Sequence, residues 1–239
     1  IREILTRKNE LIRPAVANID QALVVFAVTK PKPHFNLLDR FLVMMEQKKI
    51  PVILCFNKSD IAKESDISKM EEIYRSCGYP VFFTSAKEGW KIEEVKKILH
   101  GKTTVLAGPS GVGKSSLINL LQSEVMMETG SISRKIDRGK HTTRHSELLV
   151  LEEDEKVEDC GSYIVDTPGF SSLYVNDFEK EQLKYYFPEF GPYEGLCRFS
   201  GCDHVHEPDC AVKQAAEEGK IHELSLIHIS EPTRHAQIS

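Results

Sequence analysis

A glycine-rich stretch near the middle of the chain carries the residue types needed to bind a phosphate chain. It runs Gly108-Pro-Ser-Gly-Val-Gly-Lys-Ser115 and fits the spacing G-x-x-x-x-G-K-[ST]. Glycines let the backbone bend so that its N–H groups, and those of the following helix, face an anion. Lys114 is expected to reach the β- and γ-phosphates, and the Ser115 hydroxyl to join a Mg²⁺ shell. The predicted phosphate-binding residues are Gly108, Pro109, Ser110, Gly111, Val112, Gly113, Lys114, Ser115 and Ser116.

Asn57-Lys-Ser-Asp60 predicts the base of this nucleotide. The tetrapeptide follows an apolar run, and residues at the carboxyl end of a strand in an open α/β sheet face the ligand crevice. The Asp60 carboxylate can accept hydrogen bonds from N1–H and the 2-amino group of guanine, a donor pair that adenine lacks. ATP would leave a desolvated Asp60 unpaired, which favours GTP by a factor of about 10⁴. Lys58 is expected to lie along the base plane, and Asn57 to tie the loop to neighbouring backbone.

Thr84-Ser-Ala-Lys87 follows the next apolar run and offers a second contact to the base. A backbone N–H near Ala86 can donate to guanine O6, and Ser85 and Lys87 are assigned to the same loop. Taken alone, either tetrapeptide also suits an exposed turn, so the prediction of guanine depends on their occurring together.

Asp166-Thr-Pro-Gly169 supplies candidate groups for phosphate chemistry. It follows a short apolar run, as a Mg²⁺-binding loop after a strand would. Asp166 is expected to hold Mg²⁺ through water, and the Gly169 N–H to meet the γ-phosphate. The alternative is a plain turn, which the phosphate loop elsewhere in the chain disfavours.

Lys140-His-Thr-Thr-Arg144 offers the remaining candidate catalytic residues. Thr142 or Thr143 is expected to complete the Mg²⁺ shell when GTP is bound. Many GTPases orient the attacking water with a glutamine shortly after D-x-x-G, but here Phe170 follows, and phenylalanine cannot hold water by a hydrogen bond. We predict that His141 positions the water; the alternative is an exposed or phosphate-facing histidine.

Three of the six cysteines gather near the C-terminus. Cys197, Cys202 and Cys210 fall within fourteen residues, with His204 among them. Zn²⁺ prefers such a closed tetrahedral set in structural sites. In the absence of a secretory signal, the cluster favours one structural zinc ion over disulfides. His206 is a rival ligand.

Composition places limits on function. The 239 residues carry a net charge of −5, so any binding of nucleic acid must use a local patch. Within the cysteine-rich region, Arg198, Lys213 and Lys220 are candidates for RNA phosphate contact, against the simpler alternative of solvated charge. No apolar run approaches the roughly 18 residues of a membrane span, and no signal peptide is evident. A cytoplasmic monomer without membrane contact is expected, and the missing initial methionine predicts a fragment.

Apolar runs alternate with amphipathic stretches through the first half of the chain. The predicted strands cover residues 22–28, 51–56, 80–83 and 103–107, and the predicted helices cover 37–48, 65–76, 92–99 and the stretch after the phosphate loop. This alternation predicts an α/β fold with a mainly parallel sheet. Residues 148–151 and 163–165 are predicted to pair as antiparallel strands, and residues 123–145 to form a mobile loop.

Together the motifs resemble the translation-factor-related GTPases in a changed order. In that group the phosphate loop and D-x-x-G precede N-K-x-D and S-A-K, whereas here N-K-S-D and T-S-A-K come first. The chain therefore resembles the circularly permuted GTPases. The zinc-type cluster after D-T-P-G narrows the resemblance to the ribosome small-subunit-dependent GTPases, also called RsgA or YjeQ. Arg7-Lys-Asn-Glu-Leu-Ile-Arg-Pro14 and Gly139-Lys-His-Thr-Thr143 look like further signatures of that family.

The resemblance implies a circularly permuted P-loop GTPase fold with a small C-terminal zinc-binding domain. Residues 1–21 are expected to be the remnant of an OB-fold and a linker, 22–175 the GTPase domain, 176–224 the zinc-binding domain and 225–239 a non-native tail. The implied cofactors are GTP or GDP, Mg²⁺ and one Zn²⁺, with His204 preferred to His206 as the ligand. The implied partner is the small ribosomal subunit with its rRNA.

The residues and the family resemblance together leave three functions to be weighed, and the ribosomal partner in the first two is what the resemblance implies. The first is GTP hydrolysis in late small-subunit assembly, slow alone and stimulated by the subunit. The second is a non-enzymatic, GTP-gated rRNA-binding module, which the missing glutamine favours and which Asp166 and the threonines oppose. The third is a nucleoside monophosphate kinase, since the phosphate loop resembles that of guanylate kinases. N-K-S-D opposes it, because kinases need no such clamp on the donor base.

Overall fold

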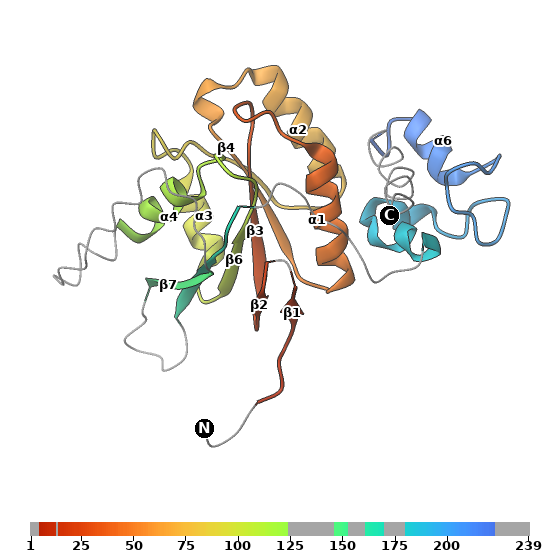
Figure 1. The fold of residues 1–239 in the computed structure, drawn as a ribbon. Coiled ribbons are helices and arrows are strands. Elements are labelled where there is room, and N and C mark those ends of the chain that lie inside the picture. The colour runs from red at the N-terminus through yellow and green to blue at the C-terminus, as the bar shows by residue number, and fades with distance from the viewer. Residues whose placement is uncertain (1–4, 13, 124–145, 153–160, 170–179, 223–239) are drawn as a thin grey trace, which may run out of the picture.

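A six-stranded sheet forms the centre of the molecule, in the order β5-β4-β3-β6-β8-β7 (Figure 1). The computed structural model describes residues 5–12, 14–123, 146–152, 161–169 and 180–222. The strands are β3 (Gln21–Ala27), β4 (Val52–Asn57), β5 (Val81–Phe83), β6 (Thr103–Ala107), β7 (Glu147–Glu152) and β8 (Ser162–Asp166). The neighbouring strands β5, β4, β3, β6 and β8 run parallel to one another, and β7 pairs antiparallel with β8. The predicted α/β fold with a mainly parallel sheet is confirmed.

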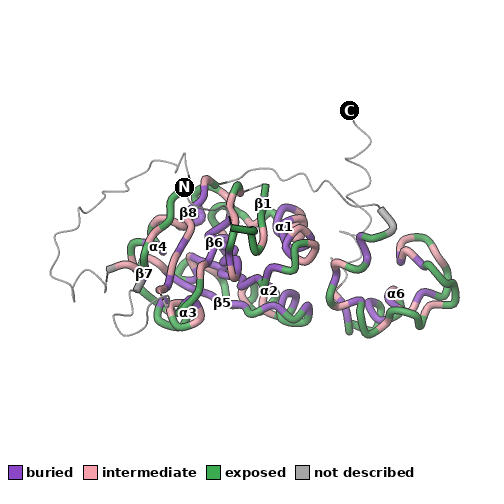
Figure 2. Tube along the Cα trace, turned by 90° about the horizontal axis from the view of Figure 1, so that it is seen from below, coloured by how far each residue is buried: buried purple, intermediate pink, exposed green. Residues whose placement is uncertain are grey.

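Two layers of helices cover the sheet because its central strands are apolar on both faces. The helices are α1 (Phe35–Gln47), α2 (Glu64–Ser76), α3 (Ile92–Leu99) and α4 (Lys114–Ser123). Alternate residues of β3 enter opposite core clusters: Val24 packs with α1 and α2, and Val25 packs with α3 and α4. Figure 2 shows the buried residues concentrated between these layers. Burying a side chain of this size contributes about 1.5–3 kcal/mol, so a strand that is buried throughout is a major source of stability.

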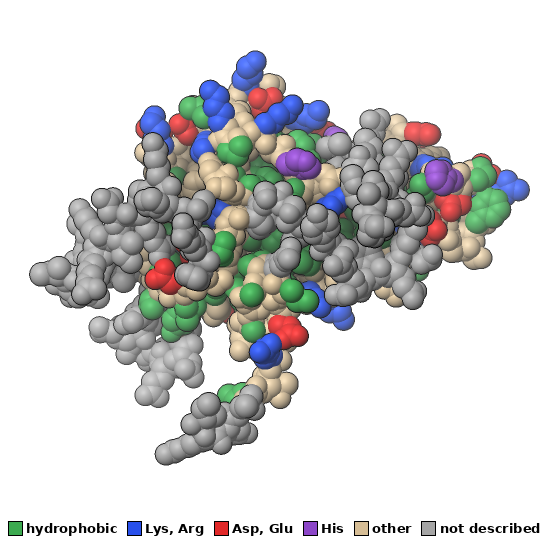
Figure 3. Space-filling view, viewed as in Figure 1, with side chains coloured by type: hydrophobic (Ala, Val, Ile, Leu, Met, Phe, Trp, Pro, Cys, Tyr) green, Lys and Arg blue, Asp and Glu red, His purple; other side chains and the backbone are tan. Residues whose placement is uncertain are grey.

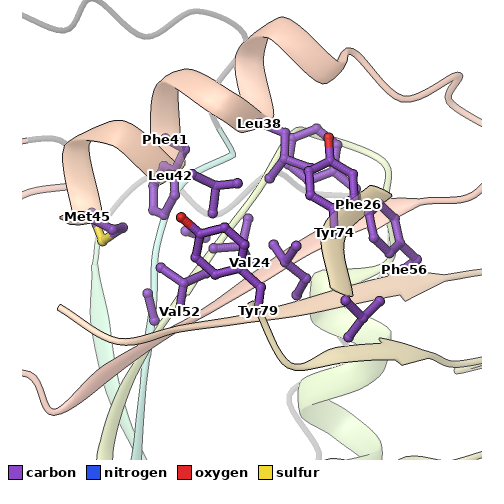
Figure 4. Packing of buried hydrophobic residues seen from close by; sticks show 14 of the residues in the cluster. Val24, Phe26, Leu38, Phe41, Leu42, Met45, Val52, Phe56, Tyr74 and Tyr79 are labelled. Carbon is purple, nitrogen blue, oxygen red and sulfur yellow. The ribbon is translucent and has the colours of Figure 1, made fainter. Parts of the chain in front are cut away.

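The layer between α1, α2 and the sheet is rich in aromatic rings. Figure 4 shows Phe41 of α1 directed at the sheet and Tyr74 of α2 close to Phe26 and Phe56. The rings of Phe56 and Tyr74 lie 5.6 Å apart, and those of Phe56 and Phe83 stack at 5.4 Å. This packing fixes α1 and α2 against the ends of β4 and β5, where the loops predicted to bind the base begin.

A short hairpin precedes the sheet. It consists of β1 (Glu10–Leu11) and β2 (Val16–Ala17), paired antiparallel. The Asn9 side chain closes it by donating to the Ile19 carbonyl at 2.7 Å and accepting from the Ile19 N–H at 3.0 Å. Leu11 and Ile19 belong to the same core cluster as α1. The hairpin is therefore packed onto the sheet, and the expected relation of residues 1–21 to an OB-fold stays a prediction.

Residues 180–222, called here the C-terminal lobe, have a core of their own. The lobe contains the 3₁₀ segments η2 (Lys180–Tyr186) and η3 (Pro188–Tyr193) and the helix α6 (Ala211–Glu217). Phe190 and Val212 are fully buried in its core, which also includes Val43 of α1. In addition, Cys77 at the end of α2 donates to the Glu189 carboxylate at 3.3 Å. The lobe thus packs against α1 and α2 (Figure 2).

Several predictions fall outside the described residues, namely those for residues 124–145, Phe170 and the tail 225–239. Among the helices that the structure describes, none is both long enough and apolar enough to cross a membrane.

Candidate nucleotide and metal sites

The phosphate loop lies between β6 and α4, where two glycines are required by close neighbours. Gly108 has φ +149°, and a Cβ atom there would lie 2.1 Å from the carbonyl oxygen of Val25 in β3. Gly113 has φ +101°, and its Cβ atom would lie 2.3 Å from Nδ2 of Asn57 in β4. Heavy atoms cannot approach so closely, so any side chain at either position would push the loop away from the sheet. The neighbouring strands therefore determine the path of the loop.

Lys114 begins α4 and turns its ammonium group back into the loop. Its Nζ donates to the carbonyl oxygens of Gly108 and Pro109, at 2.8 Å each. Burial lowers the pKa of Lys114 to about 8, although the nearby negative charge of Asp166 acts in the opposite direction. A partly buried ammonium group that already donates to two carbonyls is well placed to donate to phosphate oxygens as well. Ser115 and Ser116 follow in the first turn of α4, at the positive end of the helix dipole.

The loop after β8 lies directly against the phosphate loop. Asp166, the last residue of β8, is fully buried, and its neighbour Thr167 donates its hydroxyl to the Leu106 carbonyl at 2.6 Å. At Gly169, an added Cβ atom would lie 3.0 Å from both Lys114 Nζ and the backbone nitrogen of Ser110. The structure therefore brings Asp166 and Gly169 to the phosphate loop, although they are far from it in the sequence.

Asn57 connects three loops through one amide group. Its Nδ2 donates to the Val112 carbonyl of the phosphate loop at 2.9 Å. Its Oδ1 accepts from the Ala86 N–H at 2.9 Å and from the Thr84 hydroxyl at 3.3 Å. Because one amide uses both its donor and its acceptor, a shift in any of these loops would disturb the other two. Asn57 thus sets the distance between the phosphate loop and the residues predicted to contact the base.

The two predicted base loops are joined by further hydrogen bonds. The Ser85 hydroxyl donates to Oδ1 of Asp60 at 2.7 Å, which orients the carboxylate predicted to recognise guanine. Ser59 donates twice to the Thr84 carbonyl, from its N–H and from its hydroxyl, at 3.0 Å each. Ser59 and Thr84 are not among the residues predicted from the sequence to touch the ligand. Their positions next to Asp60 and Ser85 in the sequence are the signal that could identify them.

The lysines of these loops have different surroundings. Lys58 has the left-handed φ of 64° and donates to the carbonyls of Lys30 and Gly111, at 2.6 and 2.7 Å. Its chain therefore passes from the base loop to the phosphate loop. Lys87 is exposed and forms an ion pair with Glu88 at 2.9 Å.

The residues predicted to act on the attacking water and to complete the Mg²⁺ shell, His141, Thr142 and Thr143, lie outside the described residues. Their roles stay predictions. Among the residues predicted to bind Mg²⁺, Ser115 and Asp166 are described, at the start of α4 and at the end of β8.

The C-terminal lobe brings together the four residues that the sequence proposes as zinc ligands. The candidate ligand atoms of Cys197, Cys202, His204 and Cys210 all lie within 4.8 Å of one another. The Cys197 and Cys210 sulfurs are 3.8 Å apart, and His204 Nδ1 lies 3.6 and 3.3 Å from them. Tetrahedral Zn²⁺ with Zn–S near 2.3 Å and Zn–N near 2.0 Å requires separations of about 3.5–3.8 Å. The cluster therefore fits a zinc ion, and the sulfurs are too far apart for a disulfide.

Neighbouring side chains hold the histidine and the cysteine loop in place. His204 Nε2 lies 3.6 Å from a Glu194 oxygen, which favours Nδ1 as the atom that faces the cluster. The ring of Phe190 packs edge-on at 5.7 Å, and Lys184 donates to the Cys202 carbonyl at 2.9 Å. The rival ligand His206 is exposed and is not part of the cluster.

Two of the three basic residues proposed for RNA contact in the lobe form ion pairs. Arg198 forms an ion pair with Asp209, and Lys220 forms one with Glu218, each at 2.6 Å. These carboxylates compete with any phosphate, so the geometry does not favour the predicted role of Arg198 and Lys220 in RNA contact. Exposed pairs of this kind contribute at most about 1 kcal/mol to stability.

Comparison with known proteins agrees with this geometry. A model of the RsgA GTPase family matches residues 4–176. The chain is 58% identical over 224 residues to the small ribosomal subunit biogenesis GTPase RsgA of Agathobacter rectalis, covering 94% of this chain and 72% of that protein. It is 48% identical over 221 residues to the RsgA of Alkaliphilus metalliredigens, covering 92% and 73%.

Two solved structures extend this comparison. YjeQ from Thermotoga maritima superposes with a TM-score of 0.78 at 39% identity, over 100% of this chain and 78% of that chain. YloQ, described as a circularly permuted GTPase, superposes with a TM-score of 0.75 at 37% identity, over 99% and 75%. The predicted order of motifs therefore has the same circular permutation as a solved relative.

Proposed function

Because this chain belongs to the RsgA GTPase family, we propose that it binds GTP across the ends of β4, β5, β6 and β8 and hydrolyses it during small-ribosomal-subunit assembly. The three-way contact of Asn57 is the observation that carries this assignment, because it places the base loops and the phosphate loop side by side. A single nucleotide can then span both. The relatives' names supply the ribosomal subunit as the partner.

Each described residue has a distinct part in binding. Asp60, oriented by Ser85, accepts from the guanine N1–H and 2-amino group. The Ala86 N–H itself donates to Asn57, so we assign the contact with O6 to another backbone N–H of the same loop. Residues 108–113 and the start of α4 surround the phosphates, with Lys114 as the cation among them. Mg²⁺, when bound, would be held by Ser115 and, through water, by Asp166, and would neutralise phosphate charge.

The attacking water requires a group other than glutamine. We assign the positioning of this water to His141, and we assign the completion of the Mg²⁺ shell to the neighbouring Thr142 or Thr143. Such a site should be slow alone, because partner-supplied groups contribute a factor of about 10³–10⁵ in other GTPases. His141→Ala should abolish most of the stimulated hydrolysis and leave GTP binding intact. Undiminished stimulated hydrolysis in this variant would contradict the assignment.

The zinc cluster has a structural part in this proposal. Three thiolates and one imidazole fill four tetrahedral positions, so no open position remains for catalysis. The ion would hold together a lobe that packs on α1 through Val43. Because Gly169 precedes this lobe in the chain, loss of its contact with the γ-phosphate would move the lobe. Identical hydrogen exchange in residues 170–210 with GTP and with GDP would rule this movement out.

One assay tests the assignment as a whole. Phosphate release from GTP is measured with and without purified small subunits, and the binding of GTP and ATP is compared by calorimetry. We expect slow release alone, strong stimulation by subunits and a large preference for GTP. Nucleotide-dependent binding to subunits without release would indicate a non-enzymatic GTP-gated module. Transfer of phosphate from ATP to GMP would indicate a kinase. We propose a cytoplasmic monomer as the working form.

A further inference from the structure

Three loops at the carboxyl ends of adjacent strands form one continuous surface. Residues 28–34 follow β3, residues 58–63 follow β4 and residues 85–91 follow β5, and these strands are neighbours in the sheet. The loops are joined side by side, because Lys58 donates to the Lys30 carbonyl and Ser85 donates to Asp60. We call these three segments the base-side rim. The rim includes the residues predicted to contact guanine, and Lys58 joins it to the phosphate loop through the Gly111 carbonyl.

The base-side rim is strongly basic in an acidic chain. It holds six lysines and two carboxylates, a local charge of +4, whereas the chain has a net charge of −5. Figure 3 shows Lys and Arg side chains gathered along the upper edge of the molecule, where Figure 1 places α2 and the end of β3. Guanine is uncharged, and the phosphates of GTP are assigned to residues 108–115. The nucleotide therefore does not account for this excess of positive charge.

Part of this charge is directed outward. Lys58 is occupied by two backbone carbonyls, and Lys87 pairs with Glu88. Lys30, Lys32 and Lys63 are exposed, and Lys91, which is half-buried, ends the third loop. An exposed cluster of like charges raises the local potential and attracts anions.

The rim also presents an aromatic ring in a fixed position. Trp90, the only tryptophan of the chain, is 56% exposed. Its backbone pairs with Ser85 in both directions, at 3.0 and 3.3 Å, and Lys91 Nζ lies 5.8 Å from the centre of its ring. A single exposed apolar residue needs no explanation, but an anchored indole among lysines is the combination that binds single-stranded nucleic acid.

We propose that the base-side rim is a docking surface for single-stranded RNA. An unpaired base stacks on Trp90, and Lys30, Lys32, Lys63 and Lys91 contact the adjacent phosphates. An acidic polypeptide would satisfy the lysines but would gain little from a flat ring, so RNA fits the surface better. This inference rests on the proposed function, which makes the small-subunit rRNA the source of that RNA. It places RNA contact on the GTPase domain, at the loop that orients Asp60.

Fluorescence of Trp90 tests the stacking directly. Because the chain has one tryptophan, any quenching on addition of a uridine-rich 12-nucleotide RNA comes from this site. We expect saturable quenching, with affinity falling about 50-fold between 50 and 200 mM salt, since each of four phosphate contacts adds about 0.7 to the salt slope. Absence of saturable quenching would overturn the proposal. Equal quenching by a polyglutamate of matched charge would also overturn it and indicate a protein partner.

Paired variants test the contribution of each group, with labelled RNA followed by anisotropy. Lys32→Glu with Lys63→Glu should reduce the salt slope by about half, because two of four phosphate contacts are lost. The matched control is Lys97→Glu, an exposed lysine in the last turn of α3, at the opposite end of the sheet. Trp90→Ala should weaken RNA binding about tenfold. Its control is Phe199→Ala, a 45% exposed ring in the lobe, which should have no effect. Equal losses in test and control variants would refute the surface.

A final measurement separates this inference from the proposed function. Stimulation of GTP hydrolysis by small subunits is recorded for the unchanged chain and for the Lys32→Glu, Lys63→Glu variant. We expect the variant to need about tenfold more subunit for half-maximal stimulation, with GTP affinity unchanged. Full stimulation of this variant at the original subunit concentration would overturn the proposal that the rim binds RNA, while leaving the proposed GTPase function intact. RNA binding at Trp90 without any stimulation of GTP hydrolysis by subunits would support RNA docking on the rim and refute the proposed subunit-stimulated GTPase function.

Discussion

Asn57→Ala offers the sharpest test of how the nucleotide site is assembled. The change removes the bond from Nδ2 to the Val112 carbonyl and the two bonds that Oδ1 accepts from Ala86 and Thr84. Val112 is 1% exposed and Asn57 itself is 1% exposed, so water does not readily replace the lost amide. The phosphate loop would lose this buried tie to the base loops and keep the contact of Lys58 with the Gly111 carbonyl, while the rest of the sheet stayed unchanged.

The size of the effect follows from the groups left without a partner. An unsatisfied buried carbonyl costs about 1–3 kcal/mol, and the half-buried Ala86 N–H adds roughly 1 kcal/mol because water reaches it in part. We therefore expect a loss of about 2–4 kcal/mol in the free energy of unfolding. With a urea dependence of about 2–3 kcal/mol per molar, the midpoint of unfolding should fall by about 1 M.

Trp90 fluorescence is a suitable probe of this unfolding, because the residue closes one of the affected loops. Thr84→Val serves as the control, since it removes the hydroxyl contacts to Asn57 and Cys55 but leaves the bond from Asn57 to Val112, and it should cost about 1–2 kcal/mol. GTP affinity should fall in Asn57→Ala by more than stability alone explains, because the two halves of the site are no longer held at a fixed distance. A midpoint within about 0.3 M of the unchanged chain, together with normal GTP affinity, would refute the reasoning.

Four further predictions address other parts of the molecule. Burial lowers the pKa of Lys114 to about 8, so above that pH the loop without nucleotide carries a neutral amine. Because GTP binds the charged form, the affinity of the chain for GTP should fall by up to about tenfold per pH unit from pH 8 upward. A GTP affinity that calorimetry finds unchanged with pH would contradict this. Gly169→Ala should reduce stimulated hydrolysis about tenfold, because its Cβ atom would lie 3.0 Å from Lys114 Nζ; normal rates would show that the loops can separate freely. Asp60→Ala should lower the preference for GTP over ATP toward one in competition binding. Because Asp60 is exposed in the free chain, the starting preference is expected to lie below the factor of about 10⁴ of a fully buried carboxylate, and a retained preference would place guanine recognition elsewhere. Cys202→Ser should abolish stoichiometric zinc and make residues 180–222 sensitive to protease, since zinc contributes about 10–16 kcal/mol in small zinc domains; a purified unchanged chain without zinc would contradict the metal assignment.

Local patterns in the sequence were sufficient to predict the architecture. Apolar runs such as residues 22–28 and 51–56 suit strands that are covered on both faces, as in a parallel sheet, and these segments are β3 and β4 within one residue at each end. The antiparallel pairing of β7 with β8 was also expected, because an acidic stretch of sequence separates their apolar residues. The changed order of motifs, and with it the permuted GTPase family, could likewise be read along the chain.

The contacts between motifs could not be predicted in the same way. Asn57 and Val112 are 55 residues apart, and nothing in either segment indicates that one amide joins the phosphate loop to both base loops. The ion pairs of Arg198 and Lys220, which oppose the expected RNA contacts of the lobe, depend on side-chain directions that spacing does not give. The charge of the base-side rim could not be predicted from spacing either, because its lysines come from three loops that only the sheet brings together.

The sequence by itself therefore determined which chemistry is possible: phosphate binding, guanine recognition and zinc ligation each require particular residue types at short spacing. The tertiary structure alone decided which groups meet, because hydrogen bonds and ion pairs act over about 3 Å, whereas their partners are separated by tens of residues along the chain.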